Sequence, residues 1–221
     1  MKFHLSLDTF VISDSHFGHK AILKKEPSRS VLAKQMGFED FNTLSVHLWN
    51  TQVKEGDFIL HLGDLYFKNG WQYLSGLAGQ KRLLVGNNDL KKYTRLKDYP
   101  DWKICRKIQL KIAGKNKIYH KLESKYGKGI WKNKLLNTIV ADLGSERVMF
   151  SHFPVIDRKK NDNYASTRDI LDDIFRLCDC SINIHGHTHS RNTKDPFCLN
   201  VSGENIGFSP MRIQDVLALR P

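Results

Sequence analysis

Short apolar runs that end in polar residues recur along this 221-residue chain, and such runs are typical of buried β-strands. A longer stretch, Ile104 to Ile112, alternates apolar and polar residues and predicts a half-exposed strand. The runs that predict buried strands are Thr9–Asp14, Asp57–Asp64, Arg82–Asp89, Arg147–Pro154, SINIHGHTH (181–189) and FCLNVS (197–202), followed by MRIQDVL (211–217).

Two segments carry apolar residues at helical spacing. Phe41, Leu44 and Leu48 fall on one face of a helix predicted over residues 39–53, and a second helix is predicted over 167–177. Strands alternate with helices early in the chain and cluster late. This order predicts a layered α/β fold made of one domain, residues 1–221, with a basic insertion around 113–137.

Polar side chains stand at the carboxyl end of most predicted strands. In open α/β sheets this edge is where ligands bind, so we expect these side chains to converge although they are scattered in sequence. The expected set is Asp14, His16, Asp64, Asn87, His152, His187 and His189.

The segment HGHTH (185–189) holds three of the chain's ten histidines. Taken alone, it is as typical of a polar loop as of a metal site. Gly186 permits a turn that re-aims the residues after it.

The donors in the expected set are two carboxylates, one amide and four imidazoles. This number suits two divalent ions, and the mixture of nitrogen and oxygen suits Mn²⁺ best, with Fe, Zn²⁺ or Ni²⁺ as alternatives. A pair of such ions is suited to the in-line hydrolysis of a phosphoester.

The chain has an excess of positive charge, a formal net charge of +12, which favours an anionic partner or substrate. Between Lys111 and Lys134 there are eight lysines against one acid, and Tyr119, Tyr126 and Trp131 are interleaved with them. Lysines with aromatic rings suit nucleic acid, through phosphate contact and base stacking. The alternative is a solvated surface loop with a few anchoring rings.

Apolar runs and cysteines exclude some classes of protein. No apolar run approaches the roughly 20 residues that span a bilayer, so we expect no membrane association, and the N-terminal apolar stretch is too short for a signal peptide. The four cysteines fit no zinc-ribbon spacing. We expect them to be reduced thiols in a cytoplasmic protein.

The polar residues form motifs in a definite order: DSH (14–16), GD (63–64), GNND (86–89), SH (151–152) and GHTH (186–189). This order resembles the calcineurin-like metallophosphoesterase superfamily, whose pattern is D-x-H, G-D, G-N-H-[DE], H and G-H-x-H. HFGH (16–19) and HLGD (61–64) are most similar to a group of small bacterial and phage enzymes. The resemblance implies two mixed β-sheets flanked by helices.

The resemblance also implies a dinuclear metal centre in which a metal-bound hydroxide attacks the phosphoester. The first metal would be held by Asp14, His16, Asp64 and His189, and the second by Asp64, Asn87, His152 and His187, with Asp64 bridging.

Asn88 departs from the family pattern, because relatives usually have a histidine there that contacts the phosphate and helps to protonate the leaving group. An amide cannot deliver a proton at neutral pH, which favours a phosphodiesterase, acting on nucleic acid or nucleotides, over a broad monoesterase. His19 is a candidate substitute acid or substrate contact. The segment GDLYFKNG (63–70) lacks the arginine of the family's protein phosphatases, which argues against that role.

Two alternatives stay open at this point. The first is a phosphomonoesterase that acts on a small metabolite. The second is a non-catalytic scaffold that binds metal, although this predicts lost ligands and all seven positions are present.

Overall fold

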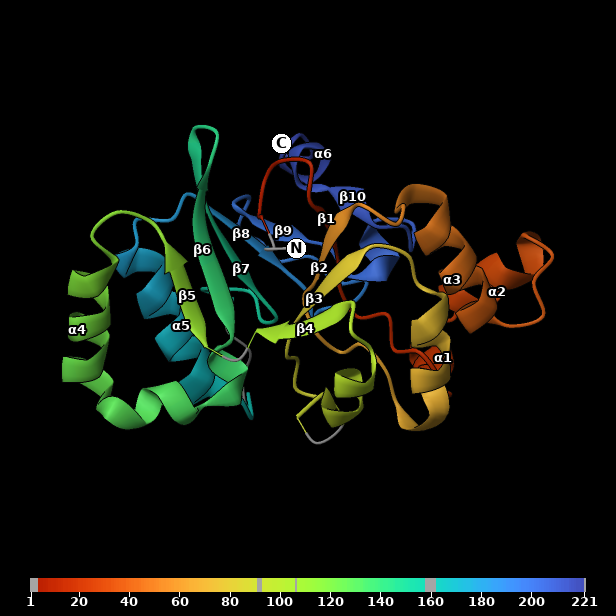
Figure 1. Cartoon of the computed structure of the whole chain (residues 1–221), viewed down its shortest axis with the longest axis horizontal. Helices are drawn as coiled ribbons and strands as arrows, with labels where there is room; N and C mark the ends of the chain where they lie inside the picture. The colour runs from red at the N-terminus through yellow and green to blue at the C-terminus, as the bar shows by residue number, and fades with distance from the viewer. Residues whose placement is uncertain (1–3, 91–92, 106, 158–161, 221) are drawn as a thin grey trace.

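The computed structural model describes residues 4–90, 93–105, 107–157 and 162–220. Two five-stranded mixed sheets lie in the middle of the molecule, with α4 and α5 on one side and α1 to α3 on the other (Figure 1). This confirms the predicted α/β layers and the two mixed sheets flanked by helices.

The first sheet has the order β10 (Met211–Arg212), β1 (Phe10–Ile12), β2 (Phe58–His61), β3 (Gln80–Leu84) and β4 (Trp102–Cys105). Strands β1 to β4 are parallel, and β10 is antiparallel to β1. The second sheet has the order β5 (Ile108–Lys111), β6 (Thr138–Leu143), β7 (Glu146–Ser151), β8 (Ile182–His185) and β9 (Cys198–Asn200). Only β6 and β7 are antiparallel to each other.

The helices are α1 (Ile22–Lys25), α2 (Ser28–Gln35), α3 (Phe41–Gln52), α4 (Lys115–Tyr126), α5 (Ala165–Leu177) and α6 (Ile213–Leu217). Short 3₁₀ helices cover Lys68–Gly76, Tyr93–Asp98, Lys128–Lys132, Lys134–Leu136 and Gly203–Asn205. No described helix has the length and apolar character that crossing a bilayer requires.

The core is divided by the alternation of side chains along the strands. In β7, Val148 and Phe150 belong to the main core, which also contains residues of the first sheet such as Ile59. Met149, between them, belongs to a second core with residues of α4 and α5, such as Leu171. Successive side chains of a strand point to opposite faces, so the second sheet has buried faces on both sides.

The predicted strand Ile104–Ile112 is wrong as one element. Its first part lies in β4, which pairs with β3, and its second part is β5, which pairs with β6; position 106, between them, lies outside the described residues. Both are edge strands of different sheets, and two half-buried edges continue the same alternation in sequence.

Strand β6 and helices α1, α2 and α4 were not predicted. Strand β6 is buried along almost its whole length, so its sequence lacks the alternation that marks a half-exposed strand. MRIQDVL is divided between β10 and α6.

The basic segment forms helix α4 and two short 3₁₀ helices and is not an irregular loop. Leu122 and Ile130 are buried in the second core, and Tyr119, Tyr126 and Trp131 pack against it. The ring of Trp131 donates a hydrogen bond to Glu123, and the hydroxyl of Tyr126 donates one to Asp173. The eight lysines of the segment are exposed.

Candidate metal centre

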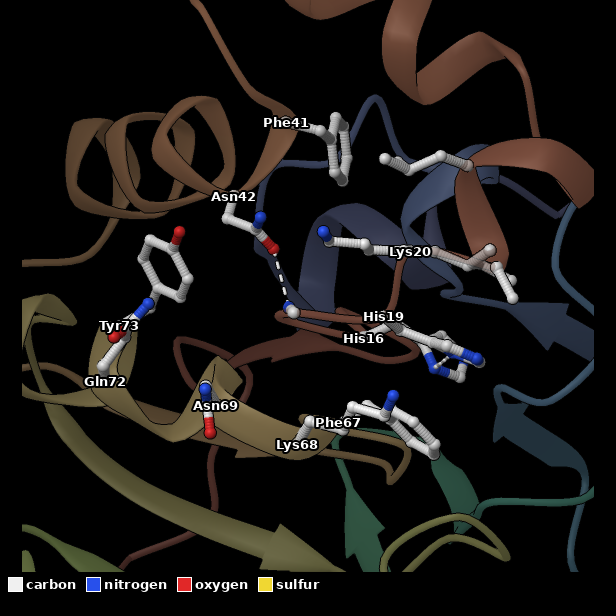
Figure 2. Close-up of a pocket in the computed structure, with 14 residues that line it drawn as sticks. His16, His19, Lys20, Phe41, Asn42, Phe67, Lys68, Asn69, Gln72 and Tyr73 are labelled. Carbon is white, nitrogen blue, oxygen red and sulfur yellow. Dashed lines mark hydrogen bonds between the residues drawn. The ribbon is translucent and has the colours of Figure 1, made fainter.

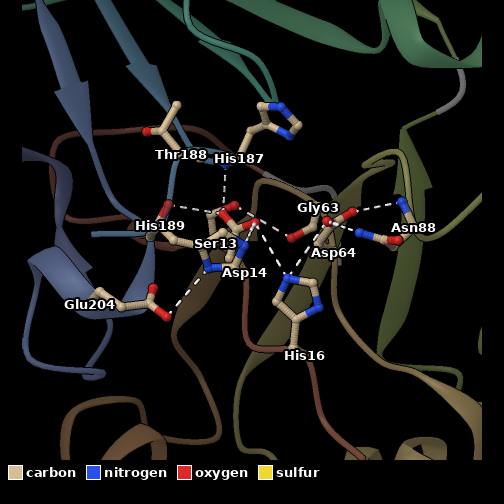
Figure 3. Close-up of polar contacts among 12 residues, drawn as sticks. Ser13, Asp14, His16, Gly63, Asp64, Asn88, His187, Thr188, His189 and Glu204 are labelled. Carbon is tan, nitrogen blue, oxygen red and sulfur yellow. Dashed lines mark hydrogen bonds and ion pairs between the residues drawn. The ribbon is translucent and has the colours of Figure 1, made fainter. Parts of the chain in front are cut away.

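The carboxyl ends of five strands meet at one place, where polar residues follow β1, β2, β3, β7 and β8. Figure 3 shows residues of this place, among them Asp14, Asp64 and His187. The two sheets are joined there. The backbone N–H of Ser13, just after β1, donates to Val201, just after β9, at 2.9 Å. Because parallel strands end on the same side of a sheet, the two sheets bring their terminal loops together at this junction.

The backbone of this site is unusual. Five of the seven expected ligand residues have a left-handed backbone with φ between 50° and 70°, a conformation that costs energy for residues other than glycine. They are Asp14, His16, Asp64, His187 and His189. Such strain concentrates at functional sites, where the surrounding structure holds each side chain in a fixed direction.

Asp14, His16 and His189 form the first group of potential ligands, with one donor atom from each lying within 4.8 Å of the others. The carboxylate oxygen Oδ1 of Asp14 lies 3.8 Å from His16 Nε2 and 3.9 Å from His189 Nε2. The other oxygen of Asp14 accepts hydrogen bonds from the backbone N–H of His187 and from the Ser202 hydroxyl. These bonds leave Oδ1 directed at the two imidazoles.

Asp64, Asn87, His152 and His187 form a second group. Asn87 Oδ1 lies 2.9 Å from His152 Nε2 and 3.0 Å from His187 Nδ1, and His152 Nε2 lies 3.6 Å from Asp64 Oδ1. The ring of His152 is fixed at its other nitrogen, which lies 2.8 Å from the carbonyl oxygen of Leu62.

Asp64 lies between the two groups. Its Oδ1 faces His152, and its Oδ2 lies 3.7 Å from His16 Nε2. Both the backbone N–H and the side-chain amide of Asn88 donate hydrogen bonds to this carboxylate. The structure therefore places Asn88 beside the carboxylate that the two groups share.

Burial sets the protonation of two imidazoles. It lowers the pKa of His187 to about 3 and holds the pKa of His16 well below its ordinary value. Both rings are therefore neutral near pH 7, and a neutral imidazole has the free electron pair that metal binding requires.

The donor set fits divalent cations. In the part of the chain that the structure describes, Asp14 Oδ1 and His16 Nε2 are buried and have no hydrogen-bond partner. Buried polar atoms without partners are costly, and a cation between them would satisfy both. The combination of imidazole, carboxylate and amide donors suits first-row metals.

Arg29 and Glu204 form a supporting pair that was not predicted from the sequence. The Glu204 carboxylate accepts hydrogen bonds from Arg29 and lies 3.3 Å from His189 Nδ1. Arg29, fully buried in α2, also donates to the backbone carbonyls of Asp14 and Ser15. Glu204 follows β9 as the expected ligands follow their strands, so the same sequence signal could have found it, whereas nothing in the sequence marked Arg29.

Asp89 is a second supporting residue that was missed. Its buried carboxylate accepts hydrogen bonds from the backbone N–H groups of Asp64, Leu65 and Gly86. Burial and the neighbouring Asp64 raise the pKa of Asp89 to about 7. Asp89 holds the turn after β2 against the turn after β3.

Three further histidines lie close to these residues. His185 is buried, and its Nδ1 lies 2.8 Å from the carbonyl oxygen of Gly186. His61 is buried beside Trp49. His19 stands at the edge of the site, with its ring stacked on Phe67 and its Nδ1 3.2 Å from His16 Nδ1.

Comparison with protein families gives one match, and it covers most of the chain. The model of the family described as calcineurin-like phosphoesterase matches residues 8–191. That range contains all seven expected ligand residues. No protein of curated function matches the sequence.

A solved structure with the same fold covers nearly the whole chain. A protein of unknown function from Aquifex aeolicus is 23% identical, with a TM-score of 0.66 over 96% of this chain and 98% of that chain. A conserved uncharacterized protein from Streptococcus pneumoniae, described as a predicted phosphoesterase, is 16% identical, with a TM-score of 0.35 over 88% of this chain and 70% of that chain. The likeness to the Aquifex aeolicus protein, at 23% identity, concerns the fold alone.

Proposed function

The chain belongs to the calcineurin-like phosphoesterase family, and from this premise we propose that it is a phosphodiesterase that uses two divalent ions, with Mn²⁺ favoured. The family and the donor set make it a metal-dependent phosphoesterase. The preference for diesters and the choice of metal are our proposal.

The observation that supports the diesterase proposal is the position of the Asn88 amide beside the shared carboxylate. Asn88 stands where the family pattern has a histidine, and its amide donates to Asp64. A monoester dianion carries one more negative charge than a diester monoanion, so it depends more on a cationic donor such as a protonated histidine. Replacing that histidine by a neutral amide therefore penalises monoesters more than diesters.

The side chains then have the following roles. Asp14, His16 and His189 hold one ion and Asn87, His152 and His187 hold the other, while Asp64 is shared. When bound, the two ions supply charge that neutralises the phosphate oxygens and lowers the pKa of water. Glu204 orients His189, and the Leu62 carbonyl orients His152, so the donor atoms keep their directions.

The test uses the purified protein loaded with Mn²⁺, assayed on bis(p-nitrophenyl) phosphate and on p-nitrophenyl phosphate. We expect kcat/KM for the diester to exceed that for the monoester by at least about tenfold. Asp64→Asn, as the control, should lose both activities. A higher kcat/KM for the monoester would make the protein a monoesterase, and bound Mn²⁺ without hydrolysis of either ester would favour the non-catalytic scaffold that binds metal.

We also propose that the exposed lysines of residues 111–134 contact the backbone of nucleic acid. Lys117, Lys121, Lys128 and Lys132 are exposed and form no ion pair in the described part of the chain, whereas Lys125 is paired with Asp173. Since the rings of this segment pack on the core, the proposal depends on the lysines and not on base stacking.

A further inference from the structure

A cavity of about 660 Å³ lies against the candidate metal centre (Figure 2). His16, from the first ligand group, and its neighbour His19 line it on that side. The rest of its wall comes from α1, from the start of α3 and from residues 67–73, just after the β2 turn. A molecule in this cavity would therefore contact a residue of the metal-binding set.

The cavity is positively charged. Its 14 lining residues include Lys20 and Lys68 and no carboxylate. Both lysines are exposed, and neither forms an ion pair among the described residues. Unpaired lysines beside a site for phosphoesters favour a second anionic group on the same ligand.

The cavity also offers flat rings and free amides. The partly exposed ring of Tyr73 lines it, as do the exposed side chains of Asn69 and Gln72. The ring of Phe67 lines it too, but it is already stacked on His19 and lies 6.0 Å from Lys68 Nζ. Within the described residues no side-chain hydrogen bond is formed by either of these two amides, whereas Asn42 accepts one from Gly18 at 2.8 Å. Rings for stacking and free amides for a polar edge together suit a nucleobase.

We propose that this cavity binds the nucleotide unit adjacent to the scissile phosphate. The base lies against Tyr73 with its polar edge on Asn69 and Gln72, and a second phosphate lies on Lys20 and Lys68. This assignment rests on the proposed phosphodiesterase function and names its substrate class, a nucleotide diester that carries a further phosphate.

A series of three chromogenic diesters tests the assignment. Bis(p-nitrophenyl) phosphate has no nucleoside, thymidine 5′-(p-nitrophenyl phosphate) adds base and sugar, and its 3′-phosphorylated form adds the second phosphate. We expect kcat/KM of the Mn²⁺-loaded protein to rise about tenfold with the nucleoside, as for one stacked base. The second phosphate should add about another tenfold.

Variants separate the two steps of this series. Lys20→Gln with Lys68→Gln should abolish only the gain from the second phosphate, and Asn69→Ala with Gln72→Ala should reduce the gain from the nucleoside, mainly through KM. Both pairs should leave turnover of bis(p-nitrophenyl) phosphate unchanged. Lys34→Gln, an exposed lysine of α2 outside the cavity, is the matched control and should change nothing.

Two results would overturn the assignment while leaving the phosphodiesterase in place. One is equal kcat/KM for the three diesters in the unmodified protein. The other is an equal loss on all three in the variants, which would show that these side chains only support the metal centre. Failure to hydrolyse any diester would instead overturn the proposed function itself.

Discussion

The proposed preference for diesters depends on one side chain, Asn88. Its two hydrogen bonds to Asp64 fix the shared carboxylate, but its amide offers no proton to a leaving group. Asn88→His should therefore raise kcat/KM for p-nitrophenyl phosphate by at least about tenfold, the lower end of what general acid catalysis contributes.

The control for this variant is Asn88→Ala, which removes the same hydrogen bond without supplying an imidazole. It should lower both activities. If Asn88→His gains no more monoesterase activity than Asn88→Ala, the role given to this position is wrong.

Gly186 shows how closely the backbone approaches the ligands. A Cβ at this position would lie 2.4 Å from Asp14 Oδ2. Gly186→Ala should displace Asp14 and lower kcat on the diester about 100-fold, a loss that a shift of about 1 Å can produce. The amount of Mn²⁺ bound per chain, measured after desalting, should also fall.

Gly129→Ala is the matched control, because a Cβ there would meet no atom within 4 Å. It should keep both the activity and the metal content. Full Mn²⁺ content in Gly186→Ala would show that Asp14 tolerates the displacement.

Helix α2 is connected to the site by the pair of Arg29 and Glu204, which is nearly excluded from solvent. Removing one partner of a buried ion pair leaves the other charge uncompensated, at a cost of about 3–5 kcal/mol. Glu204→Ala should lower the free energy of unfolding by about that amount, as measured by urea denaturation.

Asp8→Ala removes a carboxylate from an exposed pair with Arg212 and should cost less than about 1 kcal/mol. Both variants remove one carboxylate from an ion pair, so a difference in their free energies of unfolding reports the effect of burial and not of the lost charge. Equal losses in Glu204→Ala and Asp8→Ala would mean that the buried pair does not anchor α2.

The metal centre spans both sheets at the scale of the whole molecule, since Asp14 and Asp64 follow strands of the first and His152 and His187 follow strands of the second. Bound ions therefore connect the two sheets. At 100 times its Kd, Mn²⁺ should add about 2.7 kcal/mol to the free energy of unfolding, and a chelator should remove it. Thermal unfolding that is identical with Mn²⁺ and with chelator would contradict this, and Asp64→Asn should show no response.

The net charge of +12 favours anionic partners, and part of it lies on the exposed lysines of residues 111–134. Replacing Lys117, Lys121, Lys128 and Lys132 by glutamine should make the dependence of DNA affinity on salt less steep. Each lost phosphate contact should reduce the slope of log K against log salt by about 0.9 for duplex DNA. An unchanged slope in a fluorescence-anisotropy titration would mean that these lysines do not contact DNA and that the segment is an ordinary solvated surface.

Much of the fold could be predicted because the pattern of apolar and polar residues within a short segment indicates where a strand begins and ends. The apolar runs of β1, β2, β3, β7 and β8 end in polar residues, and this signal needs no knowledge of the partner strands. It failed for β6, which is buried on both faces, and for residues 104–112, which belong to two sheets, because in both cases pairing decides the structure.

By itself, the sequence determined the identity of the candidate ligands and the strand ends on which they stand, because residue type and chain order are local properties. Only the tertiary structure decided how they are held: the left-handed backbone of His187, the contact of Glu204 with His189, and the placing of Asn88 against Asp64. It also decided that Lys20 and Lys68 share a cavity with His16. These contacts are between residues that are far apart along the chain, and they form only when the two sheets and the helices pack together.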